Sequence, residues 1–279
     1  MYVCGQNKFL QNMQRLISAD NFPRFSILCG AVGSGKHLLA DAISRMIPAK
    51  YIICESNVDG VRQAINVANT QTNDAKLFVF PDIESMSISA SNSLLKFAEE
   101  PPNNTYIIIT VHNIESVLGT LISRAHIFYV DRYAKSDLLD YIEHKKYEFT
   151  NNDIVLSVCE TPGDINIAHE TDIDSLYGLA EKFVDFIGTA NIGNELKIPT
   201  LISVKENDGK LNHILFMRGI IQVTIDRMKQ SNNDSSAYYA IVSETSKYLS
   251  AMMQTGRSKQ MLLDNWIISL HMRLVGAVE

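Results

Sequence analysis

The chain has 279 residues, of which 46% are hydrophobic, and this length predicts two or three domains with a proper core. Its formal net charge of −6 argues against a broad nucleic-acid-binding surface, so we expect any DNA contact to be made within a larger assembly. The sequence predicts no signal peptide and no membrane span. Its four cysteines are scattered without a C-x-x-C pair, which favours a reduced cytoplasmic protein without disulfides or a zinc site.

The first part of the chain alternates predicted helices and strands. A helix is expected from Phe9 to about Asn21. Five apolar runs then predict strands, with helices between them: strands at 25–29, 51–54, 76–80, 106–111 and 127–130, and helices ending near 46 and covering 58–69, 89–100 and 117–122. Strands that alternate with helices predict a parallel sheet covered on both faces.

No strand is predicted after Asp131. Residues 133–170 favour two or three short helices with a turn at 161–164, and the chain reads as helical from about residue 173. Polar loops are expected at 205–209 and 231–236. We therefore predict an α/β domain over residues 1–132, a small helical domain over 133–172 and a larger helical domain over 173–279.

A glycine-rich loop lies between the first strand and its helix. Such a loop predicts a P-loop, because its backbone N–H groups turn inward toward a phosphate and its lysine adds a full positive charge. The expected ligand is ATP, ADP or phosphate, although Lys36 could equally be held by another anion. His37 stands where a working P-loop has a Ser or Thr hydroxyl for Mg²⁺, so we expect no competent Mg²⁺ and poor hydrolysis. The candidate phosphate-binding residues are Gly30, Gly33, Ser34, Gly35, Lys36 and His37.

Two carboxylates follow the third predicted strand. In P-loop ATPases this strand end offers an Asp to the metal and a Glu that orients the attacking water. Pro81 cannot ligate a metal, and a carboxylate pair at a strand end is more often solvated. Asp82 and Glu84 could therefore bind a metal only weakly, and no metal site is assigned. Thr110 or His112, at the tip of the fourth strand, lies where a γ-phosphate sensor would be, although a lone His there is more often a loop residue.

These motifs, in this order and spacing, make the chain resemble bacterial clamp-loader subunits, the AAA+ family of DNA polymerase III, and most closely the delta-prime subunits. The resemblance covers residues 1–170 well and the last hundred only as a helical domain of suitable length. It rests on Gly5-Gln6, the glycine-rich loop, Arg62, Pro162-Gly163, the block Ser93-Leu94-Leu95-Lys96-Phe97-Ala98-Glu99-Glu100-Pro101-Pro102-Asn103-Asn104-Thr105, and Ser123-Arg124-Ala125, which departs from the family's Ser-Arg-Cys at its third position.

The resemblance implies an AAA+ P-loop domain with a five-stranded parallel sheet, then a small helical lid and an all-α collar that joins partner subunits. It also implies that Arg124 is catalytic in trans, as an arginine finger for the ATP of a neighbouring motor subunit. Three departures imply that the chain has no ATPase activity of its own: His37, Pro81 with Asp82 displaced by one position, and Asp164 in place of a nucleotide-sensing arginine. The family's zinc-binding cysteine cluster is absent, so no zinc is expected.

The implied function is that of a stator subunit in a DNA polymerase III holoenzyme, which helps load the sliding clamp on primed DNA. The implied partners are tau- or gamma-like motor subunits, delta-like subunits and, through the complex, the clamp and primer–template DNA. Two alternatives stay open: an active AAA+ motor that uses Asp82 as a shortened catalytic acid, and a scaffold that works without nucleotide. Arg124 could also be an ordinary salt-bridging arginine. Lys96, Glu99 and Glu100 could be interface or structural residues, and Trp266 could be a core or subunit-contact residue.

Overall fold

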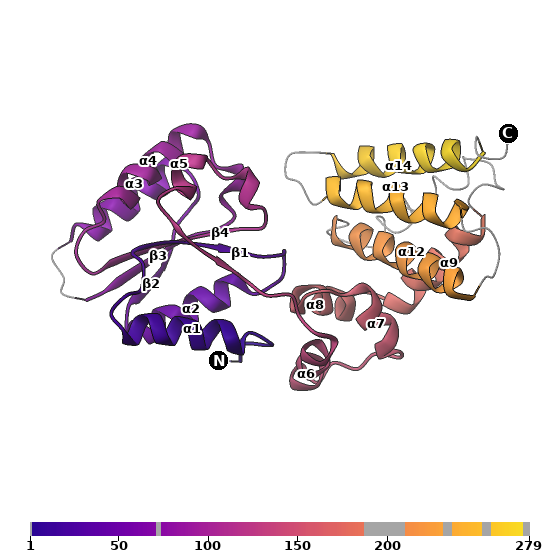
Figure 1. Ribbon diagram of the computed structural model, residues 1–279, viewed down its shortest axis with the longest axis horizontal. Helices are drawn as coiled ribbons and strands as arrows, with labels where there is room; N and C mark the ends of the chain where they lie inside the picture. Colours follow the sequence, from indigo (N-terminus) through magenta and orange to yellow (C-terminus); the bar gives the residue numbers. More distant parts are fainter. Residues whose placement is uncertain (1, 71–73, 187–209, 231–235, 253–257, 276–279) are drawn as a thin grey trace. The chain divides into compact units, whose positions relative to one another are not determined.

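The computed structural model describes residues 2–70, 74–186, 210–230, 236–252 and 258–275 (Figure 1). The chain divides into two compact units. The first unit contains residues 1–141 and 161–163, and the second contains residues 142–160 and 164–279. The domain boundaries expected after residues 132 and 172 stay a prediction. The loop predicted at 205–209, and 231–235 of the second predicted loop, lie outside the described residues.

The first unit is built on a five-stranded sheet in the order β2-β3-β4-β1-β5, with every neighbouring pair parallel. This arrangement, followed by helices, confirms the predicted α/β fold. The strands are β1 (Phe25–Cys29), β2 (Lys50–Ile53), β3 (Lys76–Phe80), β4 (Thr105–Val111) and β5 (His126–Tyr129). The helices are α1 (Asn7–Ser18), α2 (Lys36–Met46), α3 (Val58–Ala68), α4 (Ile88–Glu99) and α5 (Gly119–Ile122), with short 3-10 turns η1 (Ile83–Ser85) and η2 (Ile114–Ser116).

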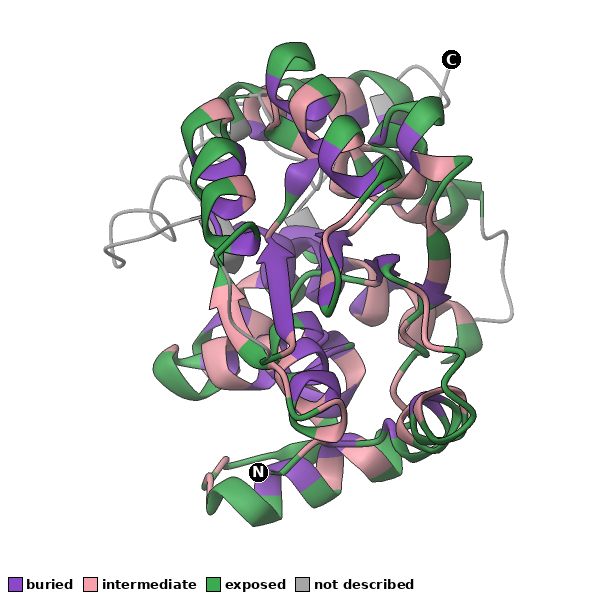
Figure 2. Cartoon of the chain, turned by 90° about the vertical axis from the view of Figure 1, so that its left-hand side faces the viewer, coloured by how far each residue is buried: buried purple, intermediate pink, exposed green. Residues whose placement is uncertain are grey.

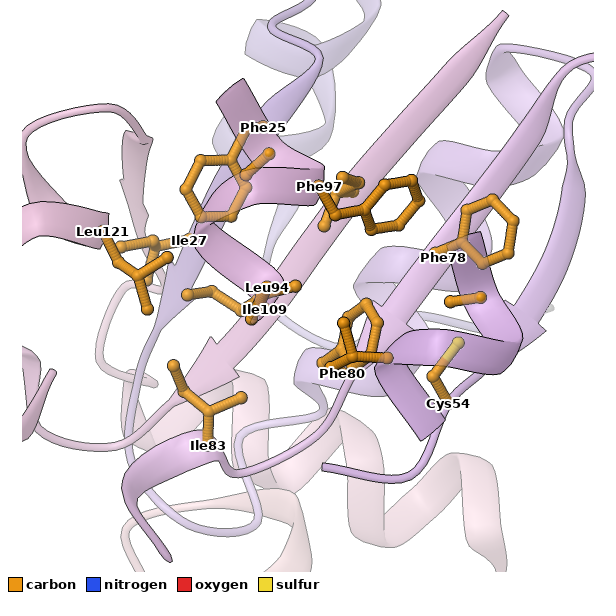
Figure 3. Close-up of a cluster of buried hydrophobic side chains, with 14 of the residues drawn as sticks. Phe25, Ile27, Cys54, Phe78, Phe80, Ile83, Leu94, Phe97, Ile109 and Leu121 are labelled. Atoms are coloured by element: carbon orange, nitrogen blue, oxygen red, sulfur yellow. The ribbon is translucent and has the colours of Figure 1, made fainter. Parts of the chain in front are cut away.

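Helices cover both faces of this sheet, which explains why the central strands are continuous apolar runs (Figure 1). Every residue of β1 and β3 is buried, and Figure 2 shows the buried positions gathered on the central strands. Successive side chains point to opposite faces, so Ile27 packs on one side and Leu28 on the other. Below α3, α4 and α5 the core is rich in aromatic rings (Figure 3), with Phe25, Phe78, Phe80 and Phe97 among its members.

The second unit is helical. Its helices are α7 (Asn152–Val158), α8 (Pro162–Glu170), α9 (Ile173–Phe186), α12 (Lys210–Gln230), α13 (Ser236–Met252) and α14 (Lys259–Val275), and α6 (Lys135–Lys145) begins in the first unit and ends in the second. The sequence predicts a turn at 161–164, whereas α8 already begins at Pro162, since proline suits the first position of a helix. None of the described helices has the length and apolarity required to cross a membrane.

The centre of the second unit is a stack of aromatic rings. Trp266 of α14 is fully buried and stacks on Phe183 of α9, with ring centroids 5.2 Å apart. Its indole Nε1–H donates a hydrogen bond of 3.3 Å to Thr245 Oγ1, so the polar edge of the ring is satisfied. Trp266 is therefore a core residue of this unit.

A buried arginine ties α12 to the end of α7 and the first turn of α8. Arg218 donates to Asp164 Oδ2 at 2.8 Å and to the carbonyl oxygen of Val158 at 3.3 Å. It also pairs with Glu160 Oε2 at 3.1 Å. The side chains of Arg218 and Asp164 are only 9% and 12% exposed. Asp164, which stands where the family resemblance would place an arginine, is thus bound by an arginine from elsewhere in the same unit.

Candidate functional site

Three segments singled out in the sequence meet at the carboxyl edge of the sheet. The glycine-rich loop follows β1, Asp82 and Glu84 follow β3, and His112 follows β4. Strands β1 and β4 are neighbours, and the helices that follow them, α2 and α5, lie on opposite faces of the sheet (Figure 1). In open parallel sheets such a change of face leaves a crevice where ligands bind. The topology therefore places the phosphate loop, the carboxylates and the expected sensor together.

The glycine-rich loop has the backbone that its composition predicts. Gly33 and Gly35 both have φ of +76°, a region that other residues rarely adopt. Gly35 is also the residue that precedes α2, so the loop runs directly into the N-terminus of that helix. Gly30 continues from β1, and its N–H donates to the carbonyl oxygen of Val111 at 3.0 Å. The loop is thus anchored to the sheet at one end and to α2 at the other.

Lys36 is turned back onto its own loop. Its Nζ donates to the carbonyl oxygens of Gly30 at 2.9 Å and Ala31 at 3.1 Å. The residue is only 6% exposed. Burial lowers the pKa of Lys36, and the nearby carboxylates of Asp82 and Glu84 oppose that shift. Two of the three ammonium donors are therefore engaged with the loop in this conformation.

Residues 161–163 and Tyr133, all of the first unit, lie against the loop. The N–H of Gly163 donates to the carbonyl oxygen of Gly33 at 3.0 Å. A Cβ at Gly163 would lie 2.4 Å from Gly33 Cα, so two glycines are needed for this approach. The Tyr133 hydroxyl donates to the carbonyl oxygen of Ser34 at 2.7 Å, and burial raises the pKa of Tyr133 to about 12. Sequence reasoning missed the role of Tyr133, which no local pattern signals.

Beside the loop, the ends of β3 and β4 are joined through side chains. The N–H of Asp82 donates to Thr110 Oγ1 at 3.1 Å. Glu84 Oε1 accepts the N–H of His112 and, at 3.3 Å, the N–H of Asn113. His112 Nδ1 lies 3.4 Å from Glu84 Oε1 and 3.8 Å from Asp82 Oδ1. The structure therefore brings both predicted carboxylates and the predicted sensor histidine into one cluster.

The loop and the strand end do not suit the hydrated Mg²⁺ that accompanies a nucleotide in P-loop ATPases. That ion takes oxygen ligands in octahedral geometry. The residue after Lys36 is His37, which is exposed and offers imidazole nitrogen. Pro81, the last residue before Asp82, has no ligand atom in its side chain. The residues present at these two positions do not fit such an ion.

Arg124 lies apart from the phosphate loop, in the turn after α5. Its Nε forms an ion pair with Glu99 Oε1 at 2.8 Å, and its Nη1 donates to the carbonyl oxygen of Thr120 at 3.1 Å. Its side chain is 42% exposed. A surface pocket of about 450 Å³ opens beside it, and its lining includes Arg24, Arg124, His126 and the carboxylate of Glu99. The structure thus brings the Ser-Arg-Ala motif and the Glu-Glu-Pro-Pro block together, a contact that the sequence did not predict.

Comparison with known proteins points to one family. A family model described as "DNA polymerase III, delta subunit" matches residues 48–133. DNA polymerase III subunit delta' of Yersinia pestis is 39% identical over 75 residues, which cover 26% of this chain and 22% of that protein. The subunit delta' of Buchnera aphidicola is 32% identical over 108 residues, which cover 37% of this chain and 32% of that protein. The matched segments thus span only 22% and 32% of these curated relatives.

The fold is similar over a much longer stretch. The crystal structure of a DNA polymerase III gamma subunit-related protein from Thermotoga maritima superposes with a TM-score of 0.50 at 15% identity. The superposition covers 95% of this chain and 99% of that one. At this identity the likeness concerns the fold alone.

Proposed function

We propose that the chain is a delta-prime-like stator subunit of a DNA polymerase III clamp loader, since the family model and two delta' relatives match parts of it. In this proposal it assembles with tau- or gamma-like motor subunits and a delta-like subunit, and the complex opens a sliding clamp and loads it on primed DNA. The chain contributes Arg124 to the ATP of a neighbouring motor and hydrolyses no ATP itself.

The observation that carries the proposal is the position of Arg124. Its guanidinium lies at the surface, 42% exposed, and lines the same pocket as Arg24 and His126. A buried arginine could not reach a partner's ligand, whereas an exposed one that shares a pocket with a second arginine, Arg24, can offer its guanidinium to an incoming triphosphate. An arginine supplied in trans stabilises the negative charge that develops on the transferred phosphoryl group.

Reconstitution tests this role. In a complex of the motor subunits, the delta-like subunit and this chain, Arg124→Ala is expected to lower the clamp- and DNA-stimulated ATPase rate by at least about tenfold, because arginine fingers contribute roughly 10³–10⁵ in related reactions. Arg15→Ala, at an exposed position of α1, is the matched control and should leave the rate unchanged. Equal rates for the wild type and Arg124→Ala would remove the arginine-finger role.

The absence of intrinsic ATPase is supported by the loop itself. Lys36 engages two loop carbonyl oxygens, and neither His37 nor Pro81 suits the magnesium ion. The isolated chain should therefore show no ATP turnover above that of Lys36→Ala. Turnover that is lost in Lys36→Ala would instead favour the active-motor alternative, with Asp82 as its catalytic acid.

One observation favours the scaffold alternative, in which the chain works without nucleotide. Gly163 and Tyr133 form hydrogen bonds to the loop at Gly33 and Ser34. The loop is therefore covered by these residues, and Lys36 is itself bonded to loop carbonyl oxygens. Calorimetric titration with ATP, ADP and inorganic phosphate separates the two functions. A stator that holds nucleotide should bind at least one of them, and Lys36→Ala should weaken that binding. A scaffold should bind none and should still assemble with its partners.

A further inference from the structure

The cluster formed by Asp82, Glu84 and His112 has the features of a metal site. We propose that it binds one divalent transition-metal ion of the Zn²⁺ type directly, without nucleotide. One ligand atom from each of the three residues lies within 4.8 Å of the others. The sequence alone assigns no metal here, because a carboxylate pair at a strand end is more often solvated.

The spacing of the three side chains suits a small ion. Two ligands that are each about 2.0–2.1 Å from a tetrahedral Zn²⁺ lie about 3.4 Å from one another. His112 Nδ1 is 3.4 Å from Glu84 Oε1 and 3.8 Å from Asp82 Oδ1. Small side-chain movements would therefore bring all three to bonding distance from one point.

Two buried atoms of the cluster lack the partners that such atoms need. Glu84 Oε2 and His112 Nδ1 are both buried, and neither has a hydrogen-bond partner within the described part of the chain. The Glu84 side chain is only 4% exposed, and its other oxygen is fixed by the N–H groups of His112 and Asn113. A buried carboxylate oxygen without a partner is costly, and a bound cation would satisfy it.

Charge and ligand type identify the class of ion. The carboxylates of Asp82 and Glu84 both lie near the ammonium of Lys36, and their combined formal charge exceeds that of the ammonium, which favours a divalent cation. One imidazole nitrogen with two carboxylate oxygens suits Zn²⁺ and its neighbours better than Mg²⁺, which prefers oxygen ligands alone. Three protein ligands leave a fourth position for water or another group. Such an ion would link the end of β3 to the end of β4 beside the phosphate loop.

The test is a titration of the full, metal-free chain with Zn²⁺ in competition with a chromophoric chelator. The wild type should bind one equivalent, and His112→Ala should weaken that binding by at least roughly tenfold. His144→Ala, at an exposed histidine on α6, is the matched control and should bind as the wild type does. The backbone N–H that bonds Glu84 is kept in His112→Ala, so this variant removes only the imidazole.

Two further readouts distinguish a metal ion bound at this cluster from one bound at a cysteine or on the surface. Co²⁺ in place of Zn²⁺ should give a spectrum without a thiolate charge-transfer band, because no cysteine is proposed as a ligand. Zn²⁺ should raise the Tm of the wild type and not that of His112→Ala, since an ion that binds only the folded state stabilises it. If no equivalent binds, or if His112→Ala binds as tightly as the wild type, the cluster is only a histidine–carboxylate contact and the proposal is wrong.

Discussion

Glu99, the last residue of α4, holds Arg124 through a 2.8 Å ion pair between Glu99 Oε1 and Arg124 Nε. The two side chains are 40% and 42% exposed, so water competes with the contact on every side. Exposed ion pairs of this kind contribute less than about 1 kcal/mol to folding. The pair is therefore weak enough to break, as the proposed role of Arg124 toward a partner's triphosphate requires.

The first prediction follows from that weakness. Glu99→Gln should change the free energy of unfolding by less than about 1 kcal/mol. In the reconstituted complex Glu99→Gln should keep the wild-type ATPase rate, because it releases Arg124 from the ion pair and leaves the guanidinium itself unchanged. Urea unfolding and steady-state turnover measure the two effects. A rate as low as that of Arg124→Ala would mean that Glu99 is needed to aim the arginine.

The second prediction concerns the buried arginine of the helical unit. Arg218→Met leaves the carboxylate of Asp164 without the guanidinium that faces it at 2.8 Å. Removing one partner of a buried ion pair costs about 3–5 kcal/mol. Urea unfolding should show a loss of this size for the helical unit. The control is Arg227→Met, whose partner Asp185 is 55% exposed, and it should cost less than about 1 kcal/mol.

A double variant sharpens this test. Arg218→Met combined with Asp164→Asn removes both charges, so part of the stability lost in Arg218→Met should return. If Arg218→Met alone costs no more than Arg227→Met, the buried pair does not hold the first turn of α8 to α12.

The third prediction tests the cover over the phosphate loop. A Cβ at Gly163 would lie 2.4 Å from Gly33 Cα, so Gly163→Ala must displace backbone and should cost about 1–3 kcal/mol. At Gly178, in α9, an added Cβ meets no described atom within 4 Å. Gly178→Ala should therefore be neutral or stabilising by up to about 1 kcal/mol. Thermal unfolding compares them, and equal Tm values would show that the close approach is not maintained in solution.

The fourth prediction concerns alkaline pH. Burial raises the pKa of Cys54 from 9.0 to about 11, so its thiol holds its proton more tightly in the folded chain. The corresponding stability is complete below the unfolded pKa and is lost as pH rises through the folded pKa. The free energy of unfolding should therefore fall between about pH 9 and 11, and less steeply in Cys54→Ala. Identical slopes would show that this thiol titrates normally.

The sequence predicts the strands well for a physical reason. A run such as residues 76–80, apolar at four of its five positions, suits a strand covered on both faces, and β3 has those bounds. The start of α8 was missed because Pro162-Gly163 favours a turn locally, whereas the structure uses the proline as the first helical residue. Local chemistry alone does not decide between these two uses.

Contacts distant in sequence lie beyond such reasoning. Arg218 and Asp164 are 54 residues apart, and no local pattern links them. Glu84 and His112 both follow predicted strands, but only the strand order, with β3 next to β4, makes them neighbours. Composition indicates which residues could carry chemistry, and the topology of the sheet decides which of them meet.

We infer that this chain serves a neighbour's ATP and not its own, and one measurement compares the two roles side by side. Single-turnover hydrolysis is followed in the reconstituted complex with either Lys36→Ala or Arg124→Ala in this chain. We expect Lys36→Ala to leave the rate of hydrolysis unchanged and Arg124→Ala to lower it by at least about tenfold. A rate that falls with Lys36→Ala and is unaffected by Arg124→Ala would show that the chain uses its own phosphate loop and supplies no arginine finger.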